Sequence, residues 1–127
     1  MQSKARRRGF TLIELLVVLA IIALMLTLAV PRYFHSVDTA KERILAENLH
    51  ATRDAIDKFY GDTGRYPDSL DELVEKRYLR SLPFDPVTDS TASWVIVPPE
   101  EQFKGEVYDI KSSAQGSNHD GTPFGNL

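Results

Sequence analysis

Glu14 is the one charged side chain within the otherwise apolar stretch from Phe10 to Val30. A carboxylate in hydrocarbon costs about 2.5–3.5 kcal/mol, so its charge needs a partner. Cleavage of the bond between Gly9 and Phe10 would create an α-ammonium group four residues before Glu14. Because residues i and i+4 share a helix face, we predict that Glu14 pairs with this new amino terminus, in its own chain or in a neighbouring copy.

The other residues able to do chemistry do not form a pattern typical of catalysis. His35, His50 and His119 are scattered along the chain, and the absence of cysteine excludes a disulfide framework and a zinc–thiolate site. The sequence contains neither a phosphate-binding glycine pattern nor a nucleophile elbow. We therefore predict that the protein is not an enzyme but the substrate of one.

The stretch from Phe10 to Val30 is long enough to cross a membrane. As a helix it spans roughly 30 Å, the thickness of the hydrocarbon core. Lys4 and Arg6–Arg8 flank its amino-terminal side, which the positive-inside rule places in the cytoplasm. A secretory signal peptide would have a shorter apolar run and a small-residue cleavage site. A generic single-span anchor would leave Glu14 unexplained.

Beyond Pro31 the apolar residues recur at helical spacing and predict an amphipathic helix from residue 32 to about residue 60. Proline at this position predicts a kink or an interruption. Gly61 and Gly64 are expected to end the helix. The apolar stripe that needs a covering sheet consists of Phe34, Val37, Ile44, Leu45, Leu49, Ile56 and Phe59.

The remaining residues predict a small mixed domain. Ser69 and Glu72 fit a capping box at the start of a short helix. β-branched and aromatic residues predict strands over 93–97 and 106–110, joined as a hairpin with a long connection. The predicted fold class is therefore α+β, with a long N-terminal helix (a membrane half and an amphipathic half) packed on a small antiparallel sheet.

Residues 8–14, Arg-Gly-Phe-Thr-Leu-Ile-Glu, resemble the signal of type IV pilins and type II secretion pseudopilins. The resemblance implies that a prepilin peptidase cuts between Gly9 and Phe10 and methylates the new amino group of Phe10. It implies that Glu14 pairs with the amino terminus of an adjacent subunit during assembly. It also implies that Pro31 marks the point where the helix loosens in a filament.

The head resembles the major pseudopilins (protein G) of type II secretion systems. The shared pieces are the Y-x-D-x-G-x-Y-P turn at residues 60–67, L-P-x-D-P at residues 82–86 and a Gly/Asp-rich final loop. In that family the final loop binds calcium, which implies ligands at Ser113, Asn118 and Asp120. Calcium takes about six to eight oxygens, and the family's second aspartate is missing here, so a plain surface loop is the alternative.

The resemblance implies a structural subunit of a pseudopilus that exports proteins across the outer membrane. Residues 1–9 would be the cleaved leader, 10–31 the transmembrane and filament-core helix, and 32–127 the pilin-like head. The expected location is the bacterial inner membrane, crossed once, with the amino terminus cytoplasmic and the head periplasmic, and then the periplasmic filament. The expected partners are other copies of the chain, the prepilin peptidase, minor pseudopilins, the inner-membrane assembly platform and the membrane.

Two alternatives remain at the level of sequence. One is a type IV pilin or a competence pseudopilin. The other, from a different class, is a monomeric membrane-anchored binding module, which predicts an uncut amino terminus and no self-association. Residues 1–9 hold basic side chains and no acidic one, so the rest of the chain is more acidic than the net charge of −3. Nucleic acid is therefore not an expected partner.

Overall fold

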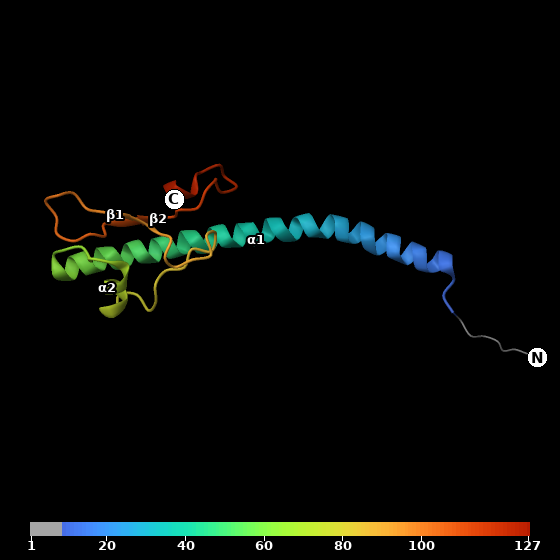
Figure 1. Cartoon of the computed structure of the whole chain (residues 1–127), viewed down its shortest axis with the longest axis horizontal. Coiled ribbons are helices and arrows are strands. Elements are labelled where there is room, and N and C mark those ends of the chain that lie inside the picture. Colours follow the sequence, from blue (N-terminus) through green and yellow to red (C-terminus); the bar gives the residue numbers. More distant parts are fainter. Residues whose placement is uncertain (1–8) are drawn as a thin grey trace, which may run out of the picture. The chain divides into compact units, whose positions relative to one another are not determined.

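The structure, a computed structural model, describes residues 9–127, so the basic leader residues Lys4 and Arg6–Arg8 lie outside the described part. The chain divides into two compact units, which we call the N-terminal unit (Met1–Val37) and the globular unit (Asp38–Leu127). The described elements, in chain order, are the helices α1 (Leu12–Thr63) and α2 (Leu70–Glu75), the strands β1 (Val95–Val97) and β2 (Asp109–Lys111), and the 3-10 turn η1 (Phe124–Asn126) (Figure 1).

Helix α1 runs for 52 residues and includes Pro31 without an interruption. The helix also passes through Gly61, so the expected end near residue 60 is too early. It ends at Gly64, whose φ of +76° is in the left-handed region and whose N–H donates to the carbonyl of Tyr60 at 2.8 Å. Glycine adopts this conformation without the steric penalty that a Cβ brings, so Gly64 rather than Gly61 terminates the helix.

Helix α2 begins at the predicted cap. The Ser69 hydroxyl accepts a hydrogen bond from the backbone N–H of Glu72 at 3.3 Å, which confirms this half of the capping box. At the other end, the N–H of Arg77 donates to the carbonyl of Val74, and the N–H of Tyr78 donates to the carbonyl of Leu73. This is a Schellman motif with arginine, at a φ of +67°, in the position that glycine usually holds.

Strands β1 and β2 pair antiparallel, with Ile96 opposite Ile110. β1 lacks the predicted residues 93 and 94, and β2 begins at Asp109 rather than the predicted 106 and extends to Lys111. The indole N–H of Trp94 donates to the carbonyl of Pro83 at 2.8 Å. The N–H groups of Glu106 and Val107 both donate to the carbonyl of Pro67, which ties the connection to the turn after α1.

The hydrophobic core lies entirely within the globular unit. The hairpin lies along one side of the second half of α1, and α2 lies on the other side (Figure 1). Of the predicted stripe, Phe34 and Ile44 remain 60% and 45% exposed, since Phe34 precedes the globular unit and Ile44 lies off the buried face. The buried core consists of Leu45, Leu49, Ala55, Ile56, Phe59, Leu70, Leu73, Trp94, Val107, Ile110 and Phe124. Burial of each large side chain contributes about 1.5–3 kcal/mol.

Arg53 fastens this sheet to α1. Its Nε donates to Asp109 Oδ1 at 2.7 Å, and its Nη2 donates to the carbonyls of Ile110 and Leu127 at 3.0 and 2.8 Å. The planar guanidinium can serve all three acceptors at once, whereas a lysine ammonium has no such fork. One helical side chain thus fixes both β2 and the last residue of the chain.

Candidate functional site

The predicted cleavage bond lies just before the start of α1. Gly9 and Phe10 are exposed and outside the helix, which begins at Leu12. A Cβ built at Gly9 meets no atom within 4 Å. The Gly9–Phe10 peptide bond is therefore in non-helical backbone that is open to an approaching enzyme.

Thr11 caps the helix and was missed by the sequence reasoning. Its hydroxyl accepts from the N–H of Glu14 at 3.0 Å, and its carbonyl accepts from the N–H of Leu15 at 3.1 Å. Threonine followed three residues later by glutamate, ahead of an apolar run, is the signature of a capping box, so the signal was present. Thr11 thereby sets where the helix begins relative to the cleavage bond.

Glu14 lies in the first turn of α1. There the positive end of the helix dipole favours a carboxylate and offsets part of the cost of its charge. The prediction that Phe10 and Glu14 share a helix face assumed a helix that starts at Phe10. In the uncut chain the helix starts two residues later, so this face is not formed. Pairing of Glu14 with a free amino terminus stays a prediction about the cleaved protein.

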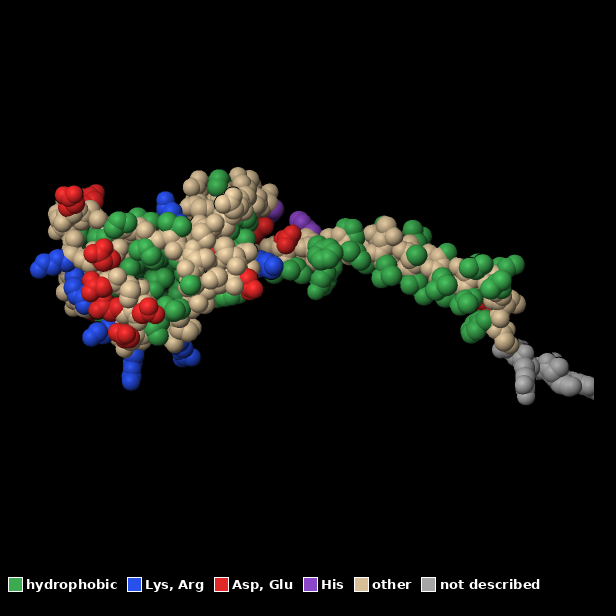
Figure 2. All heavy atoms as spheres, viewed as in Figure 1, with side chains coloured by type: hydrophobic (Ala, Val, Ile, Leu, Met, Phe, Trp, Pro, Cys, Tyr) green, Lys and Arg blue, Asp and Glu red, His purple; other side chains and the backbone are tan. Residues whose placement is uncertain are grey.

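The first half of α1 is apolar, and its large side chains are exposed. Figure 2 shows hydrophobic side chains along the face of this segment that is in view. An 18-residue window has a mean hydropathy of 2.9, so α1 is long and apolar enough to cross a membrane. The Thr27 hydroxyl donates to the carbonyl of Ala23 at 2.8 Å, so its polar hydrogen is satisfied within the helix. Glu14 is thus the charged side chain of this apolar half of the helix.

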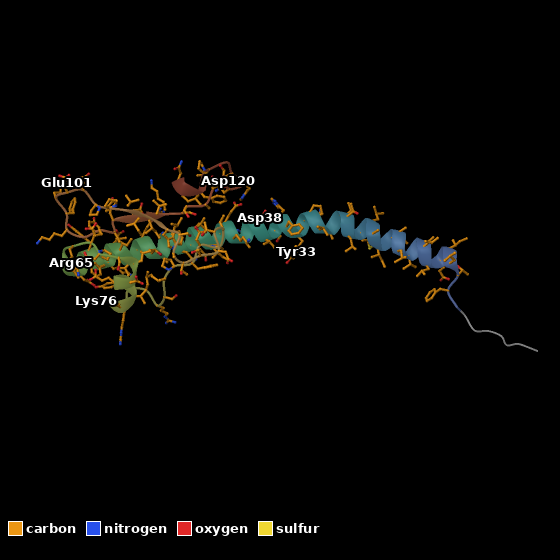
Figure 3. The ribbon with its side chains drawn as sticks, viewed as in Figure 1. Tyr33, Asp38, Arg65, Lys76, Glu101 and Asp120 are labelled. Carbon is orange, nitrogen blue, oxygen red and sulfur yellow. The ribbon has the colours of Figure 1, made fainter. Side chains whose placement is uncertain are left out.

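The predicted calcium ligands lie in or next to a tight turn near the end of the chain. Asn118 Oδ1 accepts from the N–H groups of Asp120 and Thr122 at 3.0 and 2.9 Å. Asp120 keeps 72% of its side chain exposed, and Ser113 is exposed as well. Asp120 is labelled in Figure 3. Within residues 9–127, no three His, Cys, Asp or Glu side chains gather closely enough to hold a metal ion. The amide oxygen is thus used in the turn, this donor set fits calcium poorly, and calcium binding stays a prediction.

An ion pair links this turn to α1. His119 Nδ1 lies 2.6 Å from Glu42 Oε1, and the backbone N–H of His119 donates to the same oxygen at 3.2 Å. The hydrogen bond to the Glu42 carboxylate, together with the negative charges of Asp120 and Glu42, raises the pKa of His119. Sequence reasoning treated His119 as one of several scattered histidines, because a partner 77 residues away leaves no local signal.

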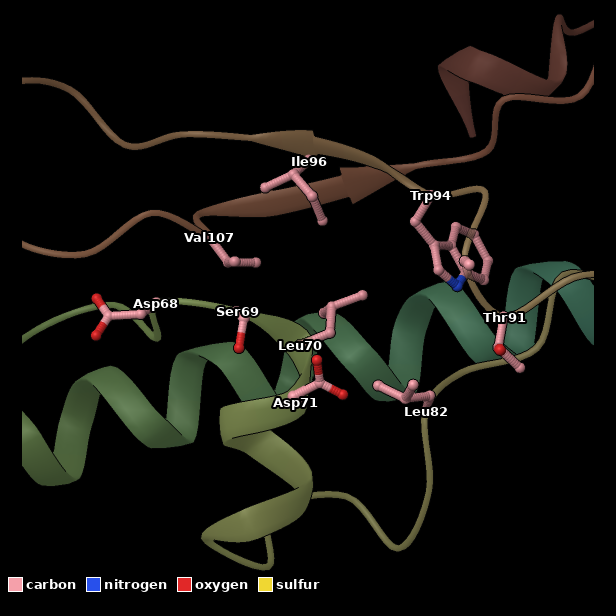
Figure 4. A pocket seen from close by; sticks show the side chains of 10 residues that line it. Asp68, Ser69, Leu70, Asp71, Leu82, Thr91, Trp94, Ile96 and Val107 are labelled. Atoms are coloured by element: carbon pink, nitrogen blue, oxygen red, sulfur yellow. The ribbon is translucent and has the colours of Figure 1, made fainter.

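A hollow of about 290 Å³ opens beside α2 (Figure 4). Its walls include the core side chains Leu70, Trp94 and Val107, while Asp68 and Asp71 stand at its rim. The hydroxyls of Ser69 and Thr91 also line it. The hollow is thus an open edge of the core that polar side chains border.

A family model described as the prokaryotic N-terminal methylation motif matches residues 4–30, the segment that holds Gly9, Phe10 and Glu14. The type II secretion system core protein G of Aeromonas hydrophila is 31% identical over 99 residues, covering 65% of this chain and 69% of that protein. The protein of the same name from Escherichia coli K12 is 28% identical, covering 98% and 96%. The chain belongs to the protein G family of type II secretion systems.

A type IV major pilin protein, PilA of Myxococcus xanthus, is also similar. It is 37% identical over 68 residues, which cover 54% of this chain and 31% of PilA. No solved structure matches. The relatives of this protein G family member are named for structural roles, as a core protein and a major pilin protein. The predicted family and the predicted α+β, pilin-like fold are both confirmed.

Proposed function

We propose that this protein is a pseudopilin, a structural subunit of a type II secretion pseudopilus that supports export of proteins across the outer membrane. The observation that carries the proposal is the arrangement at the start of α1. An exposed Gly9–Phe10 bond precedes a capped helix, and Glu14 is the lone charge of an apolar segment. The match to the methylation motif and to protein G relatives supports the same reading.

The physical character of α1 suits a helix that leaves lipid for a filament. Because its first half is apolar all round, it can exchange lipid for neighbouring copies at little hydrophobic cost. Packing between helices and the charge of Glu14 then decide whether the helix stays in lipid or joins a filament. Cleavage supplies an ammonium group near Glu14, and that group can satisfy the carboxylate within a contact between copies.

The proposal includes a location and a set of partners. The uncut chain is anchored in the inner membrane by α1, with its leader in the cytoplasm and its globular unit in the periplasm. The prepilin peptidase cuts it and methylates Phe10. It then assembles with other copies, with minor pseudopilins and with the inner-membrane assembly platform. No catalytic activity is proposed for the protein itself.

Mass spectrometry of the membrane-bound chain tests the processing step. The wild-type chain should be found cut after Gly9, with an N-methylated Phe10. Gly9→Val should leave the leader in place, because the Cβ branch blocks the approach of the peptidase. Gly61→Val is the matched control, since a Cβ there also meets open space. An uncut wild-type chain would favour the membrane-anchored binding module instead.

Glu14→Ala tests the assembly step. The variant should still enter the membrane, because removing a charge from the span favours insertion. Filaments, detected by electron microscopy and by cross-linking between copies, should be lost. Glu47→Ala, an exposed glutamate farther along α1, should assemble as the wild type does. Normal filaments from Glu14→Ala would contradict the pairing argument.

A type IV pilin is the second candidate, favoured by the similarity to a major pilin protein. Gene neighbourhood separates the two. Secretin and secretion genes beside this one favour a pseudopilus, while a retraction ATPase and adhesion genes favour a pilus.

A further inference from the structure

The few residues after Pro31 are exposed and contain two large aromatic rings. Tyr33 and Phe34 are 66% and 60% exposed, and their rings meet edge to face with centroids 5.8 Å apart. Arg32 is exposed beside them. The globular unit begins only at Asp38, so these rings belong to the N-terminal unit and not to the hydrophobic core.

The position of this group along α1 matches the far boundary of a membrane. From the cap residue Thr11 to Arg32 the helix rises by about 30 Å, the thickness of the hydrocarbon core. The apolar run stops at Val30, and the first charge after Glu14 is that of Arg32. Aromatic and basic side chains are favoured at this level, since their apolar bodies remain in lipid while polar tips reach the headgroups.

The angular spread of the group distinguishes a lipid boundary from a contact with another helix. A helix–helix contact uses residues three and four apart, which lie on one face. Arg32, Tyr33 and Phe34 are consecutive, so they project over about 200° of the helix while differing in height by only about 3 Å. Side chains that surround a helix at a single level suit a planar boundary better than a neighbouring helix.

We propose that Arg32, Tyr33 and Phe34 form an interfacial anchor that binds the headgroup region of the bilayer on the side of the globular unit. The guanidinium contacts lipid phosphates, and the rings lie at the junction of acyl chains and headgroups. The anchor fixes the depth of α1 in the membrane and must be released when a subunit leaves it. This inference rests on the proposed membrane anchoring of α1.

Fluorescence quenching by brominated lipids measures the depth. The full chain carrying Trp94→Phe and Tyr33→Trp is placed in phosphatidylethanolamine and phosphatidylglycerol vesicles doped with lipids brominated near or far from the headgroup. Quenching should be stronger with bromine near the headgroup. Leu19→Trp in the same background reports the middle of the span and should show the reverse order.

The results separate the anchor from the span. If the Leu19→Trp indole is quenched and the Tyr33→Trp indole is not, α1 spans the membrane but the anchor is wrong. If neither is quenched, the membrane anchoring itself fails. If quenching at position 33 falls as the protein-to-lipid ratio rises, a second copy covers the rings, and the proposed occupant is wrong.

Cysteine labelling gives a second measurement that leaves Trp94 unchanged. The chain has no cysteine, so Val30→Cys and Ser36→Cys each introduce a single thiol. A membrane-impermeant maleimide should label position 36 and spare position 30. Replacing both Tyr33 and Phe34 by serine should reduce this difference, whereas Tyr108→Ser, an exposed tyrosine of the globular unit, should not. An unchanged difference in the double variant would overturn the proposal.

Discussion

Replacing Asp85 by alanine should destabilise the globular unit by about 3–5 kcal/mol, because three donors lose a buried acceptor. Asp85 is 0% exposed, and its Oδ1 accepts from the N–H groups of Val87 and Thr88 at 2.9 and 3.2 Å. Its Oδ2 accepts from the hydroxyl of Ser112, itself 3% exposed, at 2.6 Å. The side chain thus holds the loop before β1 to the residue that follows β2.

The expected magnitude follows from the number of groups left without a partner. Each buried donor that loses its acceptor costs about 1–3 kcal/mol, and partial access to water lowers the cost for Val87 and Thr88. A unit of this size is stable by about 5–13 kcal/mol, so the variant loses a large share of its stability. Asp85→Asn retains one acceptor oxygen and should cost about 1 kcal/mol.

Urea denaturation of the fragment Asp38–Leu127, followed by the fluorescence of Trp94, measures these differences. The indole is 8% exposed and hydrogen-bonded to Pro83, two residues before Asp85, so it reports on this region. The double variant Asp85→Ala with Ser112→Ala should lose less free energy of unfolding than the two single variants lose added together, since both single changes remove the same hydrogen bond. Glu101→Ala is the control. An Asp85→Ala fragment within about 1 kcal/mol of wild type would refute the reasoning.

Three further predictions concern the same unit. The bidentate Arg65 guanidinium and a backbone N–H lower the pKa of Glu72 to about 2, below its unfolded value of 4.5. The stabilisation from this carboxylate should therefore be full above about pH 5 and fall as the pH drops toward 2. Urea titrations of Glu72→Gln should show a smaller loss of stability over the same pH range. Arg77→Gly should increase the free energy of unfolding by about 0.5–1 kcal/mol, because glycine adopts the left-handed backbone at φ +67° without the strain that a Cβ brings. The melting temperature should therefore rise, and a lower one would contradict this. Calorimetric titration with calcium should release no heat and give no stabilisation, because the Asn118 amide oxygen is already used in the turn; heat that Asp120→Asn abolishes would show that the final loop binds calcium.

Much of the fold could be predicted from sequence because its signals are local. Apolar spacing predicted the helix that crosses both units, and Ser69 with Glu72 predicted the start of α2. The start of β2 was wrong because the backbone N–H groups of Glu106 and Val107 bond to the carbonyl of Pro67, which lies far away in sequence. The exposure of Ile44 could not be read from spacing alone, since only packing shows which face the sheet covers.

At the start of α1 the sequence predicted the residues of a site, and the structure adds the cap that precedes them in the uncut chain. Gly9, Phe10 and Glu14 were identified from one short segment, whose chemistry depends on local order. In the uncut chain Thr11 caps the helix and leaves Phe10 outside it, so the shared face of Phe10 and Glu14 stays a prediction about the cleaved protein. A cap is a local feature, and closer attention to the threonine–glutamate spacing would have found it.

The sequence by itself determined the apolar helix and its lone carboxylate and predicted a cleavage bond, since each depends on neighbours within a turn or two. Only the tertiary structure decided which side chains hold the globular unit together. Asp85 with Ser112, Arg53 with Asp109 and Glu42 with His119 join residues 27, 56 and 77 positions apart. Polar groups at such separations carry no periodic signal, because the folded backbone alone brings donor and acceptor within reach.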